Sequence, residues 1–115
     1  MNIMIDGVNV PVEWEDNESV TALSRLVSSA PLNVQLSMYG GFEQVGSLGT
    51  SLPRNDNQTT TQPGDLVLYS GNQIVIFYGS NTWAYTRLGR IVDKSSSELD
   101  ELLSNGDVTI TLFWK

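Results

Sequence analysis

The amino-acid sequence predicts one mostly-β domain of about eight short strands with two short helices. Apolar and polar residues alternate along most of the chain, glycine-containing turns separate the alternating segments, and only two segments show helical periodicity. A length of 115 residues is that of a single domain, so we assign residues 1–115 to one domain. With so little helix to cover a sheet, short strands in this number favour a closed barrel or a sandwich.

The N-terminal part of the chain is predicted to form a hairpin and then a helix. Apolar residues alternate through Asn2–Val12 on either side of Asp6-Gly7, which suits a type I′ turn because both central residues take a positive φ. A helix is expected over Ser19–Ser29, with Asn17 or Ser19 as its N-cap. The apolar face of this helix comprises Val20, Leu23, Leu26 and Val27.

The middle of the chain is predicted to consist of strands and one long loop. Leu32–Met38 alternates most regularly, and Gly40-Gly41 turns the chain after it. Ser51–Gly64 is polar, contains two prolines and is expected to be a loop. The other strands are expected at Phe42–Leu48, Leu66–Tyr69, Gln73–Tyr78 and Tyr85–Ile91.

The C-terminal part is predicted to form a capped helix and a final strand. Ser95 and Glu98 have the spacing of a capping box, and Gly106 is suited to follow the end of the helix. Val108–Trp114 places Val108, Ile110, Leu112 and Trp114 on one face of a strand. The first and last strands are the most regular, so we expect them to pair.

Composition excludes several classes of function. The formal net charge of −7, from 6 basic and 13 acidic residues, disfavours nucleic acids and anionic membranes as partners. The chain contains neither Cys nor His, which removes thiol chemistry, the commonest neutral-pH base and the commonest transition-metal ligand. Its carboxylates lack calcium-loop spacing, so we expect no metal and no cofactor.

Targeting signals are not visible in the sequence. The longest apolar runs are about five residues, far below the ~20 that span a bilayer. The first residues alternate instead of forming an apolar block, so no signal peptide is expected. This pattern favours a cytoplasmic location, while a mature exported domain whose leader has been removed stays open.

Four segments of the chain form a recognisable series: Met38–Glu43, Ser51–Asp56, Pro63–Tyr69 and Tyr85–Ile91. In their order and spacing they resemble bacterial cyclophilin-like domain proteins. The opening hairpin, both helices and the Gly106–Thr109 ending agree as well, so the resemblance covers essentially the whole chain. It implies a closed eight-stranded β-barrel whose ends are capped by the two helices.

True cyclophilins, which share this fold, isomerise X-Pro peptide bonds. True cyclophilins use an arginine on a barrel strand, a nearby Phe-Met-x-Gln pattern, a His and a Trp, so the resemblance implies isomerase activity only where these residues are present. Here no Phe-Met follows Arg54, Arg87 or Arg90, and the chain has no His. Fold alone does not transmit activity, so isomerisation is not the leading prediction. A weak peptidyl-prolyl isomerase is the alternative prediction.

The leading prediction is a binding domain for a small molecule or a peptide. Polar side chains with functional potential gather in Tyr39–Asp56 and Tyr85–Arg90, which we expect to lie at two edges of one barrel surface. Trp83, in a short connection, is a candidate for ligand stacking, with core packing as the alternative. The candidate ligand-binding residues are Tyr39, Glu43, Arg54, Asp56, Tyr69, Tyr85, Arg87 and Arg90.

Each candidate also has a structural interpretation. Glu43 can face water beside a turn that needs glycine, and Asp56 can stabilise its own loop through side-chain to backbone bonds. Arg87 or Arg90 can bind an anionic or amide group, or can form an ion pair that stabilises the fold. A hydrolase that uses Glu43 and Asp56 together is a third hypothesis.

Overall fold

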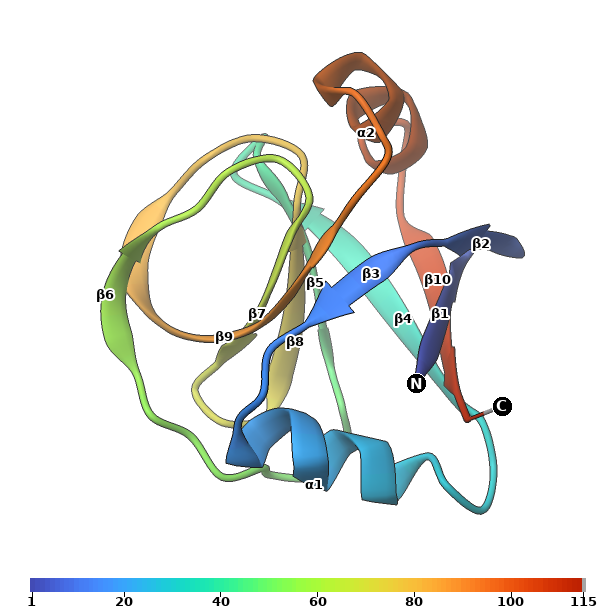
Figure 1. The fold of residues 1–115 in the computed structure, drawn as a ribbon. Coiled ribbons are helices and arrows are strands. Elements are labelled where there is room, and N and C mark those ends of the chain that lie inside the picture. Colours follow the sequence, from blue (N-terminus) through green and yellow to red (C-terminus); the bar gives the residue numbers. More distant parts are fainter. Residues whose placement is uncertain (115) are drawn as a thin grey trace.

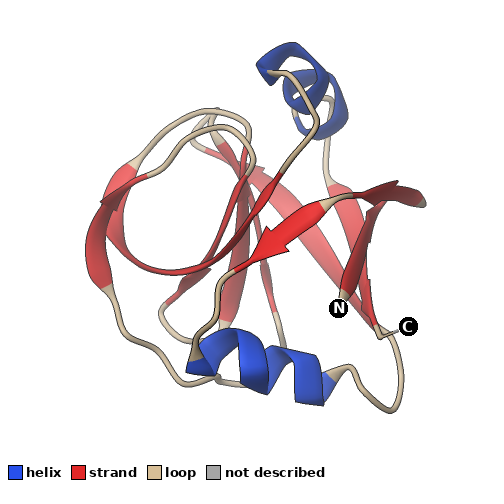
Figure 2. Ribbon diagram, viewed as in Figure 1, coloured by secondary structure: helices blue, strands red, loops and turns tan. Residues whose placement is uncertain are grey.

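The fold is a nearly closed barrel with a helix at either end (Figures 1 and 2), seen in a computed structural model that describes residues 1–114. The helices are α1 (Glu18–Leu26) and α2 (Ser96–Leu103). The strands are β1 (Asn2–Ile5), β2 (Val8–Val10), β3 (Val12–Trp14), β4 (Leu32–Tyr39), β5 (Glu43–Ser47), β6 (Asn57–Thr60), β7 (Asp65–Tyr69), β8 (Gln73–Phe77), β9 (Thr82–Ile91) and β10 (Val108–Phe113).

One broken strand joins the two edges of the sheet. The neighbours run in the order β2-β1-β10-β4-β5-β8-β7-β9-β3, and only Pro11 separates β2 from β3. Proline has no N–H for the ladder, so the strand breaks there and its two halves pair with different neighbours. Counted as one strand, β2 and β3 reduce the nine strands of this path to the eight predicted. The prediction of a mostly-β barrel with two helices is confirmed.

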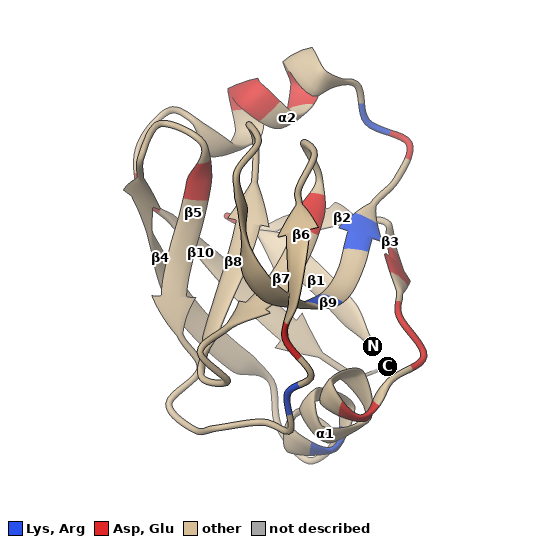
Figure 3. Ribbon diagram, turned by 90° about the vertical axis from the view of Figure 1, so that its left-hand side faces the viewer, with Lys and Arg blue, Asp and Glu red and all other residues tan. Residues whose placement is uncertain are grey.

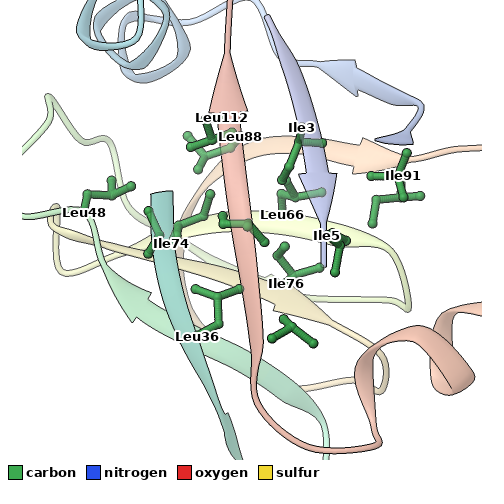
Figure 4. Packing of buried hydrophobic residues seen from close by; sticks show 14 of the residues in the cluster. Ile3, Ile5, Leu36, Leu48, Leu66, Ile74, Ile76, Leu88, Ile91 and Leu112 are labelled. Atoms are coloured by element: carbon green, nitrogen blue, oxygen red, sulfur yellow. The ribbon is translucent and has the colours of Figure 1, made fainter. Parts of the chain in front are cut away.

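The barrel interior is filled by aliphatic side chains from every side of the sheet, as Figure 4 shows for fourteen of them. The predicted pairing of the first and last strands is confirmed, since Ile3 lies opposite Leu112 and Ile5 opposite Ile110. The predicted type I′ turn between β1 and β2 is also confirmed, because Asp6 and Gly7 have φ of 47° and 81°.

The two helices cover opposite ends of the barrel (Figure 1). Asn17 caps α1 by accepting a hydrogen bond from the amide of Val20, and the predicted Ser95–Glu98 capping box of α2 is present. The predicted apolar faces are only partly buried: Leu26 is 40% exposed, and Trp114, which follows the last residue of β10, is 55% exposed. Within residues 1–114, neither helix is long and apolar enough to cross a membrane.

The predicted long loop at Ser51–Gly64 was partly wrong, because it contains β6. This strand pairs only with the first half of β9, from Asn57 opposite Tyr85 to Thr60 opposite Thr82. The pair arches away from the barrel wall (Figure 1), and we call residues 57–60 and 82–85 the arm. Three of the four β6 residues are exposed, so no alternation marks the strand in the sequence.

A bulge in β9 decides where its arginines point. Leu66 lies opposite Gly89 and Val67 opposite Arg87, so Leu88 is the extra residue. Because the bulge shifts the alternation by one residue, Leu88 and Ile91 are both buried while Arg90 is exposed. A Cβ on Gly89 would lie 2.6 Å from the carbonyl oxygen of Glu13, so glycine permits the close approach of β3.

Candidate functional site

A cavity of about 390 Å³ lies on the outer face of the barrel, between the β4–β5 turn, the ends of β7 and β8, and the arm. Its size is typical of small-molecule sites. Apolar surface dominates the lining, which includes Tyr39, Phe42, Val45, Tyr69, Trp83 and Tyr85. We call this space the aromatic cavity.

A second apolar cluster, separate from the barrel interior, supports the aromatic cavity. Val67, Val75, Phe77 and Tyr85 are buried together on the outer face, with Phe42 packed against them. The Phe77 ring lies edge-on to Tyr85 at a centroid distance of 5.6 Å and parallel to Phe42 at 6.4 Å. The arm is therefore attached to the barrel wall by packing through Tyr85.

The Gly40-Gly41 turn positions the Phe42 ring. Both glycines have positive φ, at 66° and 74°. A Cβ on Gly40 would lie 2.3 Å from a ring carbon of Phe42, whereas one on Gly41 would meet nothing within 4 Å. The amides of Tyr78 and Gly79 both donate to the Phe42 carbonyl oxygen at 3.0 Å. The glycine turn before Phe42 and the hydrogen bonds to its carbonyl oxygen thus fix this residue beside the cavity.

Glu43 is the only acidic residue among the described ones that line the aromatic cavity, and it is 7% exposed. Its side chain comes from the start of β5, where it lies opposite Tyr39 and Phe77. Burial raises the pKa of its carboxyl from 4.5 to about 7. Burial is the only cause of this shift, and Glu43 joins neither ion pair of residues 1–114. The carboxyl therefore lacks a partner for its charge.

The other polar groups of the cavity come from Gln73, Asn81 and the tyrosines. The Asn81 Nδ2 donates to the Tyr85 hydroxyl at 2.8 Å, and Thr61 holds the Asn81 backbone through three hydrogen bonds. Burial raises the pKa of the Tyr85 hydroxyl, which keeps its proton. These groups offer hydrogen bonds to a ligand but no positive charge.

A larger and more polar cavity, of about 640 Å³, lies between the start of α1, the Pro53–Asn55 loop and the outer part of β9. We call it the polar cavity. Tyr85 lines both cavities, and Arg54 and Arg87 line only the polar one. Glu15 and Glu18 contribute carboxylates to the same wall.

Both arginines that line the polar cavity are paired with a carboxylate. Arg87 donates to both oxygens of the buried Asp65 carboxylate, at 3.0 and 3.3 Å, and these hydrogen bonds raise the pKa of the guanidinium further. Asp65 also accepts from the Gln62 amide at 2.8 Å. The ion-pair interpretation of Arg87 therefore describes its contacts, although the residue also lines a cavity.

Arg54 and Asp56 form the second ion pair, with 3.5 Å between the guanidinium Nε and a carboxylate oxygen. The other oxygen of Asp56 accepts a hydrogen bond from Thr86 at 2.7 Å, and Thr86 accepts from the Asn55 amide at 2.9 Å. These contacts fix the loop before β6 against β9. Asp56 is thus engaged in holding its own loop.

The predicted site residues divide into three groups. Tyr39, Glu43, Tyr69 and Tyr85 line the aromatic cavity, although they come from four different strands. Arg54, Asp56 and Arg87 lie at the polar cavity or beside it. Arg90 is exposed and lies opposite Asp65 and Glu13 in the sheet, away from the lining of both cavities.

Sequence reasoning missed several residues of the aromatic cavity. Phe42 and Val45 line it beside Glu43, and Gln73 and Asn81 supply amides. Glu43 and Val45 share one face of β5, so alternation was the available signal for Val45. Trp83 is 55% exposed and lines the cavity, but it belongs to β9 and not to the short connection predicted from the sequence.

The described acidic residues do not form a metal-binding cluster. Acidic residues are spread over several elements (Figure 3). Within residues 1–114, no three His, Cys, Asp or Glu side chains are grouped to hold a metal ion.

The chain belongs to the cyclophilin-like family, whose model matches residues 3–113. No curated protein matches the chain. Family membership agrees with the barrel and with the resemblance seen in the sequence.

Proposed function

We propose that this protein is a binding module whose aromatic cavity takes a small organic molecule or a side chain of a peptide. The observation that carries the proposal is the combination of an apolar, ring-lined cavity of about 390 Å³ with one buried and unpartnered carboxyl. Pockets of this kind, mostly apolar with a few convergent polar groups, are typical of ligand sites. Residues of the barrel wall and of the arm both contribute to its lining.

Binding is supported over hydrolysis by the separation of the carboxylates. Glu43 lines the aromatic cavity, while Asp56 accepts a hydrogen bond from Thr86 and pairs with Arg54 beside the polar cavity. A mechanism with two carboxylates needs both groups to flank one substrate bond. The proposed module therefore uses Glu43 for recognition.

Prolyl isomerisation is the alternative activity, and it needs a cationic or amide handle beside an apolar seat. The aromatic cavity offers the seat, but the residues described as lining it include no Arg or Lys. Arg87 of β9, which lines the neighbouring polar cavity, is bonded to Asp65. NMR exchange spectroscopy on a proline peptide measures this activity. We expect the protein to leave the cis–trans exchange rate unchanged.

The binding proposal is tested by amide NMR with a fragment library and a mixture of short peptides. We expect some members to shift the amide signals of Tyr39, Val45 and Trp83 and to leave those of α1 in place. Trp83→Ala should weaken these ligands, whereas Trp114→Ala, which removes a ring that is also 55% exposed, should not. If no library member at millimolar concentration shifts the cavity signals, the proposal is wrong.

A further inference from the structure

The buried carboxyl of Glu43 is the feature that the binding proposal leaves unexplained. A carboxylate that is largely removed from water needs donors or a counter-charge, and a group without either is costly. Asp65, the other acidic side chain that is more than nine-tenths buried, has Arg87 and the Gln62 amide as donors. Glu43 has neither kind of partner within residues 1–114. Of the two buried acidic side chains, Glu43 is thus the one that lacks a partner.

We infer that the aromatic cavity binds an organic cation, an amine or a methylated ammonium group, whose positive charge lies against Glu43. This inference rests on the proposed binding function and names its ligand class. A cation is the chemistry that supplies what the protein leaves out, namely a counter-charge for a buried carboxylate. An anionic ligand would meet Glu43 with no Arg or Lys in the described lining to offset the repulsion.

The rings around Glu43 suit the same ligand class. Tyr39, 65% exposed, and Trp83, 55% exposed, stand at the mouth, while Tyr69 and Tyr85 lie deeper with their centroids 6.2 Å apart. The face of an aromatic ring attracts a cation, and cages of such rings recognise methylated ammonium groups. Tryptophan gives the strongest attraction of the aromatic side chains, and Trp83 is carried by the arm.

Long-range charge favours the same class. The chain has a formal net charge of −7, which raises the local concentration of cations around the whole molecule. The titratable groups that face Glu43 from neighbouring elements are tyrosines: Tyr39 from β4, Tyr69 from β7, Tyr85 from β9 and Tyr78 after β8. Burial raises the pKa of the Tyr78 and Tyr85 hydroxyls, so both keep their protons near pH 7, whereas the carboxyl of Glu43 changes its charge in this range.

The pH dependence of binding separates a cation from a neutral ligand. A cation pairs with the ionised carboxylate, so its affinity rises as the pH increases through the titration of Glu43. A neutral hydrogen-bond acceptor prefers the protonated carboxyl, so its affinity falls over the same range. The sign of the change therefore reports the class of ligand.

The test uses two pairs of probes that differ in charge and have nearly the same shape: choline against 3,3-dimethylbutan-1-ol, and benzylammonium against benzyl alcohol. Amide NMR titrations at pH 6 and pH 8 measure each dissociation constant. We expect at least one cation to bind about tenfold more tightly at pH 8 than its neutral partner. We also expect its affinity to be lower at pH 6.

Two variants locate the effect. Glu43→Gln keeps the shape of the side chain and should abolish the preference for the cation, while Glu101→Gln, at an exposed position of α2, should preserve it. Trp83→Ala, at a solvent-exposed ring, should weaken the cation without unfolding the protein.

The possible failures are distinguishable. If the alcohols bind the cavity as tightly as the cations, the inference of a cationic ligand is wrong and the proposed binding function stands. If neither the four probes nor the fragment library shifts the cavity signals, both proposals are wrong.

Discussion

The aromatic cavity and the polar cavity share Tyr85 as a common wall, but their charged groups differ in how they are paired. In the polar cavity, Arg87 bonds to both oxygens of Asp65, and Arg54 lies within 3.5 Å of Asp56. In the aromatic cavity, the buried carboxyl of Glu43 has no such partner within residues 1–114. The first arrangement stabilises the fold, whereas the second leaves a charge for a ligand to neutralise.

This difference indicates how one small barrel separates stability from function. A buried charge without a partner lowers the stability of the folded state, and groups with strongly shifted pKa values are concentrated at functional sites. Paired charges next to a cavity are weaker evidence for a site. We therefore rank the aromatic cavity above the polar one, although the polar one is larger.

The largest effect is expected where a paired charge is broken. Arg87→Met should destabilise the fold by about 3 kcal/mol, because it leaves the Asp65 carboxylate buried and unpaired. Urea unfolding followed by tryptophan fluorescence measures this change.

Arg90→Met is the matched control on the same strand. It should change the free energy of unfolding by less than about 0.5 kcal/mol, because Arg90 is exposed and forms no ion pair among the described residues. Equal losses in the two variants would show that the Arg87–Asp65 pair is unimportant.

Removal of the unpaired charge should have the opposite sign. The folded pKa of Glu43 lies above its unfolded value, so the folded protein binds more protons between about pH 4.5 and 7, and this contribution to stability falls as the pH rises through that window. Glu43→Gln should remove this slope and stabilise the protein by up to about 3 kcal/mol at pH 8, with little change at pH 4. Urea unfolding at both pH values provides the measurement. A Gln variant that is less stable than the parent at pH 8 would mean that Glu43 has a partner.

The turn that positions Phe42 offers a smaller effect with its own control. Gly40→Ala and Gly41→Ala impose a similar cost of about 1 kcal/mol, since both positions have positive φ. Gly40→Ala should cost about 1 kcal/mol more, because its Cβ would displace the Phe42 ring. It should also move the amide signals of the aromatic cavity. Indistinguishable stabilities and spectra for the two variants would contradict this role for Gly40.

The smallest effect on stability is expected at the mouth of the aromatic cavity. Trp83→Ala should change the free energy of unfolding by less than about 0.5 kcal/mol, because the ring is largely exposed on the arm. Thermal unfolding checks this value. A loss of several kcal/mol would mean that Trp83 packs as part of the fold and is not available to a ligand.

Regular elements of the fold were predictable from the sequence because each carries a local signal. The Asp6-Gly7 turn, the Ser95–Glu98 capping box and the alternation of Leu32–Met38 all lie in the expected elements. The strand β6 was not predictable, since its exposed residues show no alternation and its only partner is the distant first half of β9. Alternation placed Trp114 on the same strand face as Ile110 and Leu112, but the strand ends at Phe113 and Trp114 is 55% exposed, because alternation does not show where a strand ends.

The candidate site was predictable only in part. Tyr39 and Glu43 flank a glycine turn that marked them, but their proximity to Tyr69 and Tyr85 depends on the order of strands in the sheet. The bulge at Leu88 turns Arg90 outward, and a lone glycine in the sequence does not fix the position of such a bulge. The absence of a partner for Glu43 is a property of three-dimensional packing, and no local pattern reports it.

The most direct test of the central claim is the pKa of Glu43, followed by carbon-detected NMR of its carboxyl with and without a saturating organic cation. The account predicts a pKa of about 7 in the free protein and a clear decrease when choline or benzylammonium is bound. A free pKa close to 4.5, or a value that does not move when the cation binds, would contradict it.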